Sequence, residues 1–295
     1  MTRRLRWLAW AAAIATYLLI VLGAVVRITG SGLGCGNDWP VCHGRLFPSF
    51  DDLTTLIEWN HRLVAAIVST LVVLVAGVTW WERRGVGTLK DAGGERSKTS
   101  RGGYLALGLL VVQVLLGAVT VKLDLPPWTV ILHLGTALAL FAVLLWVALG
   151  APARRPGAAA LVAAGWGFVT VLFGGLTANL GAATACVGFP LCNGQLVPVG
   201  NYLQHIHWTH RVLAYGLAVY LLVWTLRSRR RGAAVVLGLV VLQVAVAATM
   251  VLLTVPQSLQ AAHAAVGAAL WGALVVVAVL ESRAPKPESP AGAGT

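Results

Sequence analysis

The sequence has few charged residues, and acidic residues are especially scarce. Of its 295 residues, 11% are charged and only 10 are Asp or Glu, whereas 58% are hydrophobic. The mean hydropathy is +0.81. A soluble domain of ordinary composition carries about 25% charged residues, so this composition excludes an ordinary soluble globular protein. Long apolar runs with few charges are what a membrane-spanning helix needs, at about 20 residues per span.

Eight apolar runs are long enough to cross a bilayer as helices. The first is too long for a cleaved signal peptide, and it lacks a small-residue cleavage site. We therefore predict an all-α polytopic membrane protein with eight transmembrane helices, at about residues 8–29, 55–80, 103–123, 128–150, 158–180, 204–226, 233–254 and 258–280.

The net charge of +12 does not indicate a nucleic-acid-binding protein, because the basic residues are divided among alternate loops. By the positive-inside rule, this pattern places both termini in the cytoplasm. The prediction is a multi-pass protein of the cell membrane that contacts the lipid bilayer and no nucleic acid. The basic clusters lie at residues 3–6, 82–101, 154–155, 227–231 and 283–286.

Only four cysteines occur, and all lie in loops on the predicted outer side, within CGNDWPVC and CVGFPLC. Disulfides persist on that oxidising side of the membrane. We predict two loop disulfides, Cys35–Cys42 and Cys186–Cys192. The alternatives are four unpaired cysteines or a metal site, although the CxxC spacing typical of metal sites is absent.

The sequence repeats itself after four spans. IEWNHRLVAAI (57–67) matches IHWTHRVLAYG (206–216), and YLLIVLGAVVRITGSGLGCG matches FVTVLFGGLTANLGAATACV. Gln113 and Gln243 each precede a histidine by 20 residues. An even number of spans per repeat gives both halves the same orientation, which makes a parallel repeat. We predict two tandem four-helix bundles, in 1–151 and 158–281, joined by a short linker around 152–157 and followed by a disordered cytoplasmic tail in 282–295.

Four histidines lie at matched depth in the spans that run from outside to inside: His61, His133, His210 and His263. Each is about five to seven residues into its span, or on the order of 8–10 Å deep. Ionisable residues inside a membrane are costly and are candidates for function, although a single such histidine is often only a hydrogen-bonded core residue. Two facing imidazoles suit the axial positions of a haem iron, whereas zinc prefers more protein ligands. We predict that each half binds one haem iron through its histidine pair.

Arg62 and Arg211 directly follow two of these histidines. Because arginine pairs well with carboxylates, we predict that they bind haem propionates. Snorkelling of the two side chains to the membrane interface is an equal alternative.

The two copies differ at Glu58, which is replaced by His207 in the second. Glu58 and His61 are three residues apart and share a helix face. A carboxylate beside a haem can accept protons or stabilise a developing cation, so we predict Glu58 as the catalytic residue. The alternative is an exposed interfacial carboxylate. The prediction makes the first half the reactive one and the second half the holder of a redox partner.

Together, the EWNHR and HWTHR segments, the cysteine pairs, the matched histidines and the eight-span repeat resemble the haem A synthase family over residues 5–281. The resemblance implies an oxidoreductase of haem A biosynthesis. It would oxidise the C8 methyl group of haem O to a formyl group by successive hydroxylations, with water as the oxygen source. The product, haem A, serves terminal oxidases.

The resemblance also implies roles for particular residues. His61 and His133 match the haem O substrate site, His210 and His263 match the ligands of a haem b cofactor, and Glu58 matches a carboxylate needed for oxidation. Haem O synthase and terminal oxidase assembly factors are the implied partners, and homo-oligomerisation is left open. The neighbouring imidazoles of His205 and His207 leave open a shift of the second site by one helical turn.

Two other functions share some of these features. A dihaem membrane cytochrome that exchanges electrons with quinone would have the histidine pairs and the bundles, but no need for Glu58 or the cysteine loops. A haem carrier or sensor would need a binding site without chemistry. Chromatography of extracted haem separates these alternatives from the enzyme.

Overall fold

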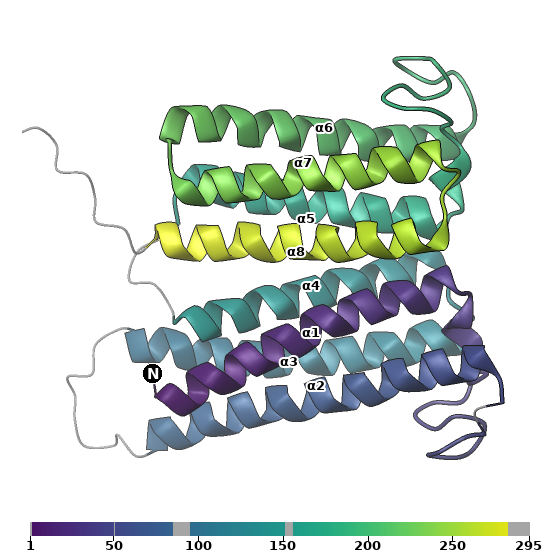
Figure 1. Cartoon of the computed structure of the whole chain (residues 1–295). Coiled ribbons are helices and arrows are strands. Elements are labelled where there is room, and N and C mark those ends of the chain that lie inside the picture. Colours follow the sequence, from purple (N-terminus) through teal and green to yellow (C-terminus); the bar gives the residue numbers. More distant parts are fainter. Residues whose placement is uncertain (1, 50, 85–94, 151–155, 283–295) are drawn as a thin grey trace, which may run out of the picture.

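The computed structural model of the protein describes residues 2–49, 51–84, 95–150 and 156–282. Eight long helices follow one another along the chain (Figure 1). Two short 3₁₀ turns, η1 (Ser31–Leu33) and η2 (Ala182–Thr184), follow the first and the fifth helix. The helices are α1 (Arg3–Ile28), α2 (Leu53–Arg84), α3 (Glu95–Lys122), α4 (Pro127–Leu149), α5 (Ala158–Asn179), α6 (Tyr202–Ser228), α7 (Arg231–Leu252) and α8 (Gln257–Glu281).

The helix starts follow local sequence signals. The hydroxyl of Thr2 accepts a hydrogen bond from the N–H of Leu5 at the start of α1. This bond satisfies one of the N–H groups that a helix start leaves unpaired. α4 and α8 begin directly after Pro126 and Pro256, and the fixed φ angle of proline suits this position.

All eight helices are long and apolar enough to cross a membrane, which confirms the predicted number of spans. Three helices extend well beyond their predicted bounds. α1 begins at Arg3 rather than near residue 8. α2 continues to Arg84 rather than ending near residue 80, and α3 begins at Glu95 rather than near residue 103. These extensions contain charged residues, so a search for apolar runs alone does not find them.

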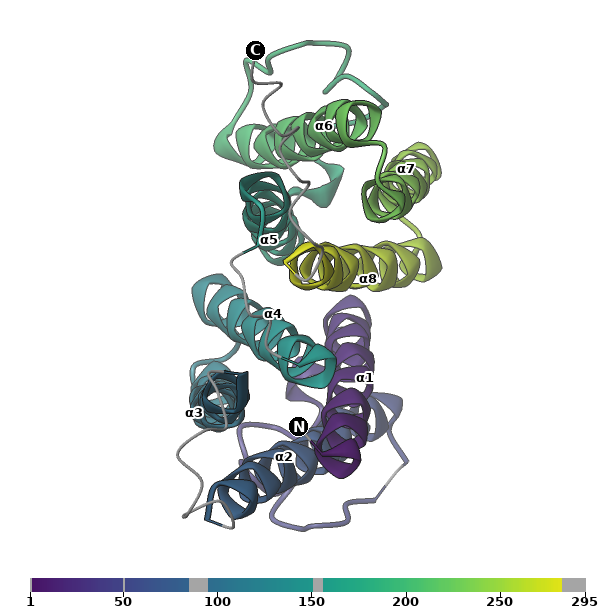
Figure 2. The ribbon, with the colours of Figure 1, turned by 90° about the vertical axis from the view of Figure 1, so that its left-hand side faces the viewer.

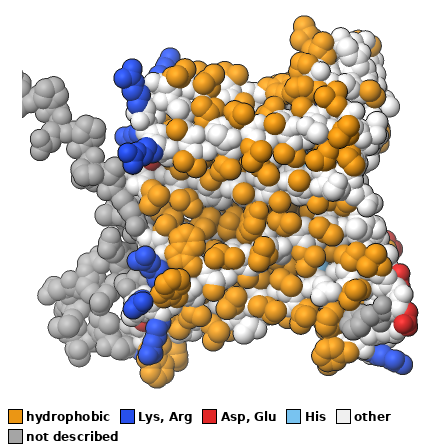
Figure 3. All heavy atoms as spheres, in the orientation of Figure 1, with side chains coloured by type: hydrophobic (Ala, Val, Ile, Leu, Met, Phe, Trp, Pro, Cys, Tyr) orange, Lys and Arg blue, Asp and Glu red, His pale blue; other side chains and the backbone are white. Residues whose placement is uncertain are grey.

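The outward faces of the helices are apolar, and side chains such as Ile14, Val73 and Val219 are more than half exposed. Exposure of this much apolar surface is unfavourable in water and suits a lipid surrounding. Figure 3 shows apolar atoms along the length of the helices and Lys and Arg side chains gathered at the end that holds the N-terminus. The chain is a multi-pass membrane protein.

The helices form two groups of four, as the end-on view shows (Figure 2). In the first group, α1 and α3 both pack against α2 and α4, and the second group repeats this with α5 to α8. The groups meet where α1 packs on α8, α5 packs on α4, and α4 packs on α8. The first two contacts are equivalent under the repeat, as expected for parallel halves related by rotation about an axis along the helices. The predicted pair of four-helix groups is confirmed.

Aromatic side chains fill the junction between the groups. The ring centroids of Phe168 in α5 and Trp271 in α8 are 5.4 Å apart, and the Trp271 indole N–H donates to the carbonyl of Leu138 in α4 at 3.3 Å. The hydroxyl of Tyr17 in α1 donates to the carbonyl of Ala265 in α8 at 3.2 Å. Each polar atom of these rings therefore has an acceptor, and the two groups are joined by packing and by hydrogen bonds.

Long loops follow α1 and α5 at one end of the molecule, which we call the loop end (Figure 1). Each loop begins at a glycine with positive φ, Gly30 at 68° or Gly181 at 70°, where glycine avoids the strain of a side chain. Each loop is closed by a disulfide, so both predicted pairs are present: Cys35–Cys42 and Cys186–Cys192. Residues 151–155 of the predicted linker and 283–295 of the predicted tail lie outside the described residues.

Candidate functional site

His210 of α6 and His263 of α8 face each other inside the second group. Their ring centroids are 6.4 Å apart, and the ring planes are nearly perpendicular, at 86°. Nδ1 of His210 donates to the carbonyl of Thr170 in α5 at 3.1 Å. This bond places the proton on Nδ1 and leaves the lone pair of Nε2 free, which is the arrangement that metal-binding histidines adopt.

Glycines make room for these imidazole rings. A Cβ atom at Gly174 of α5 would lie 2.8 Å from Cε1 of His210. Its equivalent in the first group, Gly23 of α1, would place a Cβ 3.2 Å from Cε1 of His61. Any side chain at these positions would push the rings aside, so the glycines help to position the histidines.

His61 of α2 and His133 of α4 are the equivalent pair in the first group. Their Nδ1 atoms are buried and have no hydrogen-bond partner among the residues that the structure describes. A Cβ at Gly117 of α3 would lie 3.1 Å from Cε1 of His133. Since a buried polar atom without a partner is costly, this arrangement favours a ligand between the two rings.

A glutamine contacts one histidine in each group. Nε2 of Gln113 in α3 lies 3.1 Å from Nε2 of His133. Nε2 of Gln243 in α7 lies 3.0 Å from Nδ1 of His263 and donates to the carbonyl of that residue at 3.0 Å. The sequence contained the signal for this pair, an identical spacing in both halves, but no role was predicted from it.

The separation of His210 and His263 fits two ligands of one haem iron. Metal–imidazole bonds of about 2.0–2.1 Å on either side of one ion place two ring centroids roughly 6 Å apart, and the separation of His210 and His263 is 6.4 Å. Within the described ranges, no group of three or more His, Cys, Asp or Glu residues could hold a metal ion. A porphyrin supplies the equatorial nitrogen ligands and needs only axial ligands from the protein. The His210–His263 pair therefore suits an iron held in a porphyrin.

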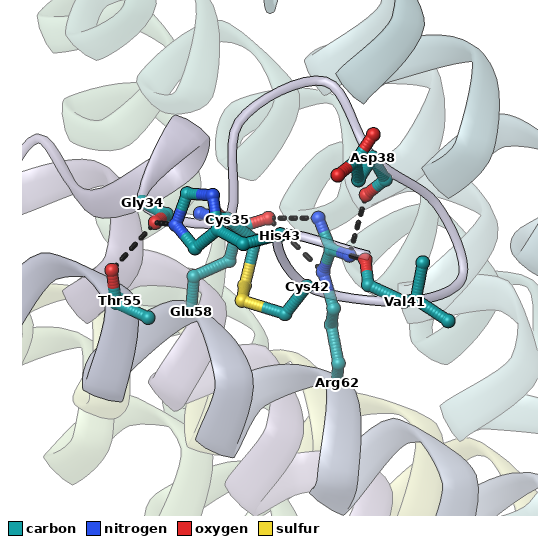
Figure 4. A network of polar contacts seen from close by, with 9 residues as sticks. All are labelled: Gly34, Cys35, Asp38, Val41, Cys42, His43, Thr55, Glu58 and Arg62. Carbon is teal, nitrogen blue, oxygen red and sulfur yellow. Dashed lines mark hydrogen bonds and ion pairs between the residues drawn. A yellow bond between two sulfur atoms is a disulfide. The ribbon is translucent and has the colours of Figure 1, made fainter. Parts of the chain in front are cut away.

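Glu58 lies beneath the first disulfide loop and is 3% exposed. Its Oε1 accepts hydrogen bonds from Nη2 and Nε of Arg62 at 2.5 and 3.1 Å, and its Oε2 accepts from the N–H of Cys35 at 2.7 Å (Figure 4). Nη1 of Arg62 donates to the carbonyls of Asp38 and Val41 at 2.7 and 2.6 Å. The carboxylate, the arginine and the disulfide loop thus form one polar network.

His207 occupies the corresponding position in the second group. Its Nδ1 donates to the carbonyl of Ala182 at 3.0 Å, and its Nε2 accepts from Nε of Arg211 at 3.2 Å. Arg211 also donates to three loop carbonyls, those of Cys186, Gly188 and Leu191. Both ring nitrogens of His207 are therefore used, which makes it a neutral imidazole that holds the arginine.

The position of the second site along α6 follows from these contacts. His205 is exposed, and His207 is turned to the loop. His210 is the imidazole on this helix that faces His263. This geometry favours His210 over His205 and His207 as the partner of His263, and the ligand assignment stays a prediction.

The two arginines that were predicted to bind haem propionates contact the disulfide loops. The guanidinium groups of Arg62 and Arg211 are directed at main-chain carbonyls of their own loops. A sequence shows the charge but not these carbonyls, because the loop fold brings them together. Propionate binding by either arginine stays a prediction.

Comparison with known proteins agrees with this geometry. A family model described as cytochrome oxidase assembly protein, COX15-CtaA, matches residues 6–275. The chain belongs to the COX15-CtaA family. A protein named heme A synthase from Symbiobacterium thermophilum is 36% identical over 290 aligned positions, which cover 88% of this chain and 90% of that protein.

Other relatives of this COX15-CtaA member carry the same name. Heme A synthase from Alkalihalophilus pseudofirmus is 31% identical over 245 positions, covering 78% of this chain and 79% of the relative. Heme A synthase from Geobacillus thermodenitrificans is 28% identical over 308 positions, covering 96% and 93%. The similarity therefore includes both groups of helices, and the resemblance noted in the sequence is confirmed.

Proposed function

We propose that this chain is a haem A synthase that oxidises the C8 methyl group of haem O to a formyl group. Membership of the COX15-CtaA family and the names of the relatives support the proposal. The single observation that carries it is the asymmetry at Glu58. A buried carboxylate shares a helix face with His61 in the first group, and a neutral imidazole takes its position in the second.

The first group is the substrate site. His61 and His133 hold the iron of haem O from opposite sides. Their buried, unpartnered Nδ1 atoms support this assignment, because a bound porphyrin gives the rings something to bind. In contrast to His210, neither of these histidines has a carbonyl acceptor among the described residues to fix its tautomer. Weaker positioning suits a substrate that must bind and leave.

Glu58 acts at the edge of the substrate porphyrin rather than at its iron. It precedes His61 by three residues and therefore lies nearly one turn closer to the loop end on the same face. Each hydroxylation breaks one C–H bond, with loss of a proton and of two electrons that leave one at a time, and forms a C–O bond to water, which releases a second proton. After two rounds the hydrated aldehyde loses water. The carboxylate stabilises the developing positive charge at carbon and accepts the proton that water releases. Arg62 and the Cys35 N–H hold it in place.

The second group holds a resident b-type haem on His210 and His263. When bound, this haem supplies an acceptor for electrons removed from the substrate. The hydrogen bond from Nδ1 of His210 to the Thr170 carbonyl supports a permanent site, because such a bond orients a metal ligand and raises its basicity. Gln243 restrains His263 from the side of α7.

The orientation in the membrane is part of the same proposal. The loop end faces outward from the cell membrane, and the end rich in Lys and Arg faces the cytoplasm, in agreement with the positive-inside rule (Figure 3). Disulfides persist on the outer, oxidising side. Because both porphyrins are poorly soluble, we further propose direct transfer from haem O synthase and to the assembly factors of terminal oxidases.

Chromatography of extracted haem tests the proposed reaction. The full-length chain is expressed in a membrane that contains haem O but no haem A, with the His61→Ala variant as the control. Haem A, preceded by a hydroxylated haem, is expected with the wild type and not with the variant. If the wild type yields only haem O and protohaem, the chain is a dihaem cytochrome or a haem carrier instead.

A further inference from the structure

Arg27 of α1 is a half-buried cation at the junction between the two groups. Its Nη2 donates to Oε1 of Gln260 in α8 at 3.1 Å, and within the described part of the chain its side chain makes no other hydrogen bond. None of the described carboxylates forms an ion pair with it. A guanidinium carries several N–H donors and can hold a carboxylate with two of them at once. Most of the side-chain donors of Arg27 therefore have no acceptor among the residues that the structure describes.

Arg27 lies beside both histidine pairs. It follows Gly23 by four residues on one face of α1, and Gly23 is the residue that makes room for the His61 ring. Gln260 precedes His263 by three residues in α8. It therefore lies on the same side of the helix, about one turn closer to the loop end. The hydrogen-bonded pair thus lies at the loop-end edge of both candidate sites, between the two groups of helices.

The repeat contains this pair only once. The residue of α5 that follows Gly174 by four positions is Ala178, and the residue of α4 that precedes His133 by three is Val130. The equivalent contact of α5 with α4 therefore lacks the arginine and the glutamine. A requirement of helix packing would apply to both contacts, because the repeat makes them equivalent. The presence of this arginine–glutamine pair at only one of the two equivalent contacts indicates a ligand on one side of the junction.

The other arginines near the histidines are already occupied. Arg62 binds Glu58 and two loop carbonyls, and Arg211 binds His207 and three loop carbonyls. Arg27 lies in the last turn of α1, where the negative end of the helix dipole favours a cation. The helix dipole explains why a positive charge is tolerated at that depth. It does not supply the carboxylate with which a guanidinium usually pairs.

We propose that Arg27, positioned by Gln260, binds a propionate carboxylate of haem at the boundary between the two groups. This inference rests on the proposed function in one respect, the presence of haem on the histidine pairs. The carboxylate can belong to the substrate haem of the first group or to the resident haem of the second, and the experiment below separates these two sources.

Titration with two porphyrins tests the proposal. Full-length protein from haem-limited cells, in detergent, is titrated with protohaem and with protohaem dimethyl ester, in which both carboxylates are masked. We expect the wild type to bind the free acid about 10-fold or more tightly than the ester, as for a charge-assisted hydrogen bond. We call the affinity for the free acid divided by the affinity for the ester the acid/ester ratio. Arg27→Gln should bring this ratio close to one, and Arg27→Lys should keep part of it. The matched control, Arg45→Gln, removes an exposed loop-end charge and should keep the whole ratio.

The two sources are separated in backgrounds that retain one site. His210→Ala leaves the first site and His61→Ala leaves the second. If Arg27→Gln removes the preference for the free acid in only one background, the haem bound in that background is the one whose carboxylate Arg27 holds. If it removes the preference in both backgrounds, Arg27 holds a carboxylate of each haem. Gln260→Leu, which keeps the charge but releases the guanidinium, should lower the ratio by a smaller factor.

The proposal is overturned if the wild type has no preference for the free acid. It is also overturned if Arg27→Gln keeps the preference in both backgrounds, or if Arg45→Gln removes it equally. Because these titrations require no oxidation of haem O, failure of the proposed reaction would leave their outcome interpretable.

Discussion

The two groups of helices hold an arginine in the same place with different partners. In the first group Arg62 pairs with the carboxylate of Glu58, and in the second Arg211 donates to the neutral imidazole of His207. Both arginines also bind carbonyls of their own disulfide loop. The second group therefore demonstrates that this network forms without a carboxylate. Stabilisation of the loop therefore does not require a carboxylate, which supports the chemical role proposed for Glu58 in the first group.

The histidines differ between the groups in a complementary way. His210 donates from Nδ1 to the carbonyl of Thr170, whereas Nδ1 of His61 has no partner among the described residues. The second hydrogen bond of a ligating imidazole fixes its tautomer and its orientation. The group with the carboxylate has the less constrained histidine, and the group without it has the more constrained one. This is the division expected between a substrate site and a cofactor site.

Substitution of single histidines should give the largest difference between the two groups of helices. We predict that His210→Ala or His263→Ala abolishes the tightly bound b-type spectrum, because each removes an axial ligand of the resident haem. His61→Ala or His133→Ala should leave that spectrum largely intact while haem A formation stops. Absorption spectra of the purified variants measure the first effect, and haem extraction measures the second. Loss of the resident spectrum only in the first-group variants would reverse the assignment of the two sites.

Glu58→Gln should have the next largest effect. The substitution keeps the shape of the side chain and removes its charge, so we expect haem O to bind and its oxidation to slow by about 10²-fold or more. Arg62 keeps its two loop carbonyls, as Arg211 does without a carboxylate. The measurement is the content of haem O, hydroxylated haem and haem A.

The matched variant in the second group is His207→Gln, which should slow oxidation far less because that group only holds its haem. Normal haem A formation with Glu58→Gln would mean that the difference between Glu58 and His207 is incidental. An equal loss in both variants would assign the two positions a common structural role.

Much of this architecture could be predicted from the sequence. The bilayer constrains both the length and the composition of a span, so apolar runs predicted eight helices. Their ends were misplaced mainly where charged residues extend α1, α2 and α3. The matched depth of the histidines followed from their distance to the start of each span. Internal repetition strengthened both inferences, because each feature was present twice.

The contacts that define the sites could not be predicted, because most of them involve backbone atoms. Glu58 accepts from the N–H of Cys35, and His210 donates to the carbonyl of Thr170. Every residue carries these backbone groups, so only the tertiary fold decides which of them meets a side chain. The role of Arg27 depended in the same way on knowing that α1 packs against α8 rather than against another apolar helix.

Removal of either disulfide should lower the stability of the protein by a similar amount, but only removal of the first should slow haem O oxidation. The two loops close over sequence separations of 7 and 6 residues, so opening either should cost a similar free energy of unfolding, roughly 2–3 kcal/mol in the chain-entropy model. Cys35→Ser with Cys42→Ser should also slow oxidation, because the N–H of Cys35 holds the Glu58 carboxylate. The equivalent change at Cys186 and Cys192 should leave oxidation nearly unchanged.

Chemical denaturation of each double variant and its haem A yield test this contrast. Alkylation provides a separate check, since none of the four thiols should react before a reductant is added. Stoichiometric labelling of Cys35 and Cys42 in untreated protein would contradict the first disulfide, and equal activity losses in the two double variants would contradict the special role of the first loop.

The smallest predicted effect concerns the residues that cap α2 and α6. Asp52 and Asn201 occupy equivalent positions, and each accepts hydrogen bonds from N–H groups of the first turn. Hydrogen bonds from the Thr54 hydroxyl and the Thr55 N–H lower the pKa of the Asp52 carboxyl from 3.8 to about 2. Because the folded pKa is the lower one, the stabilisation by the charged form is complete above pH 3.8 and is lost as the pH falls through about 2.

A helix N-terminus favours a negative charge, so Asn201→Asp should slightly raise Tm at neutral pH and Asp52→Asn should slightly lower it. Both differences should shrink as the pH falls from 3.8 through about 2, as followed by tryptophan fluorescence during heating, and a difference that does not shrink over this range would assign the effect to shape rather than charge.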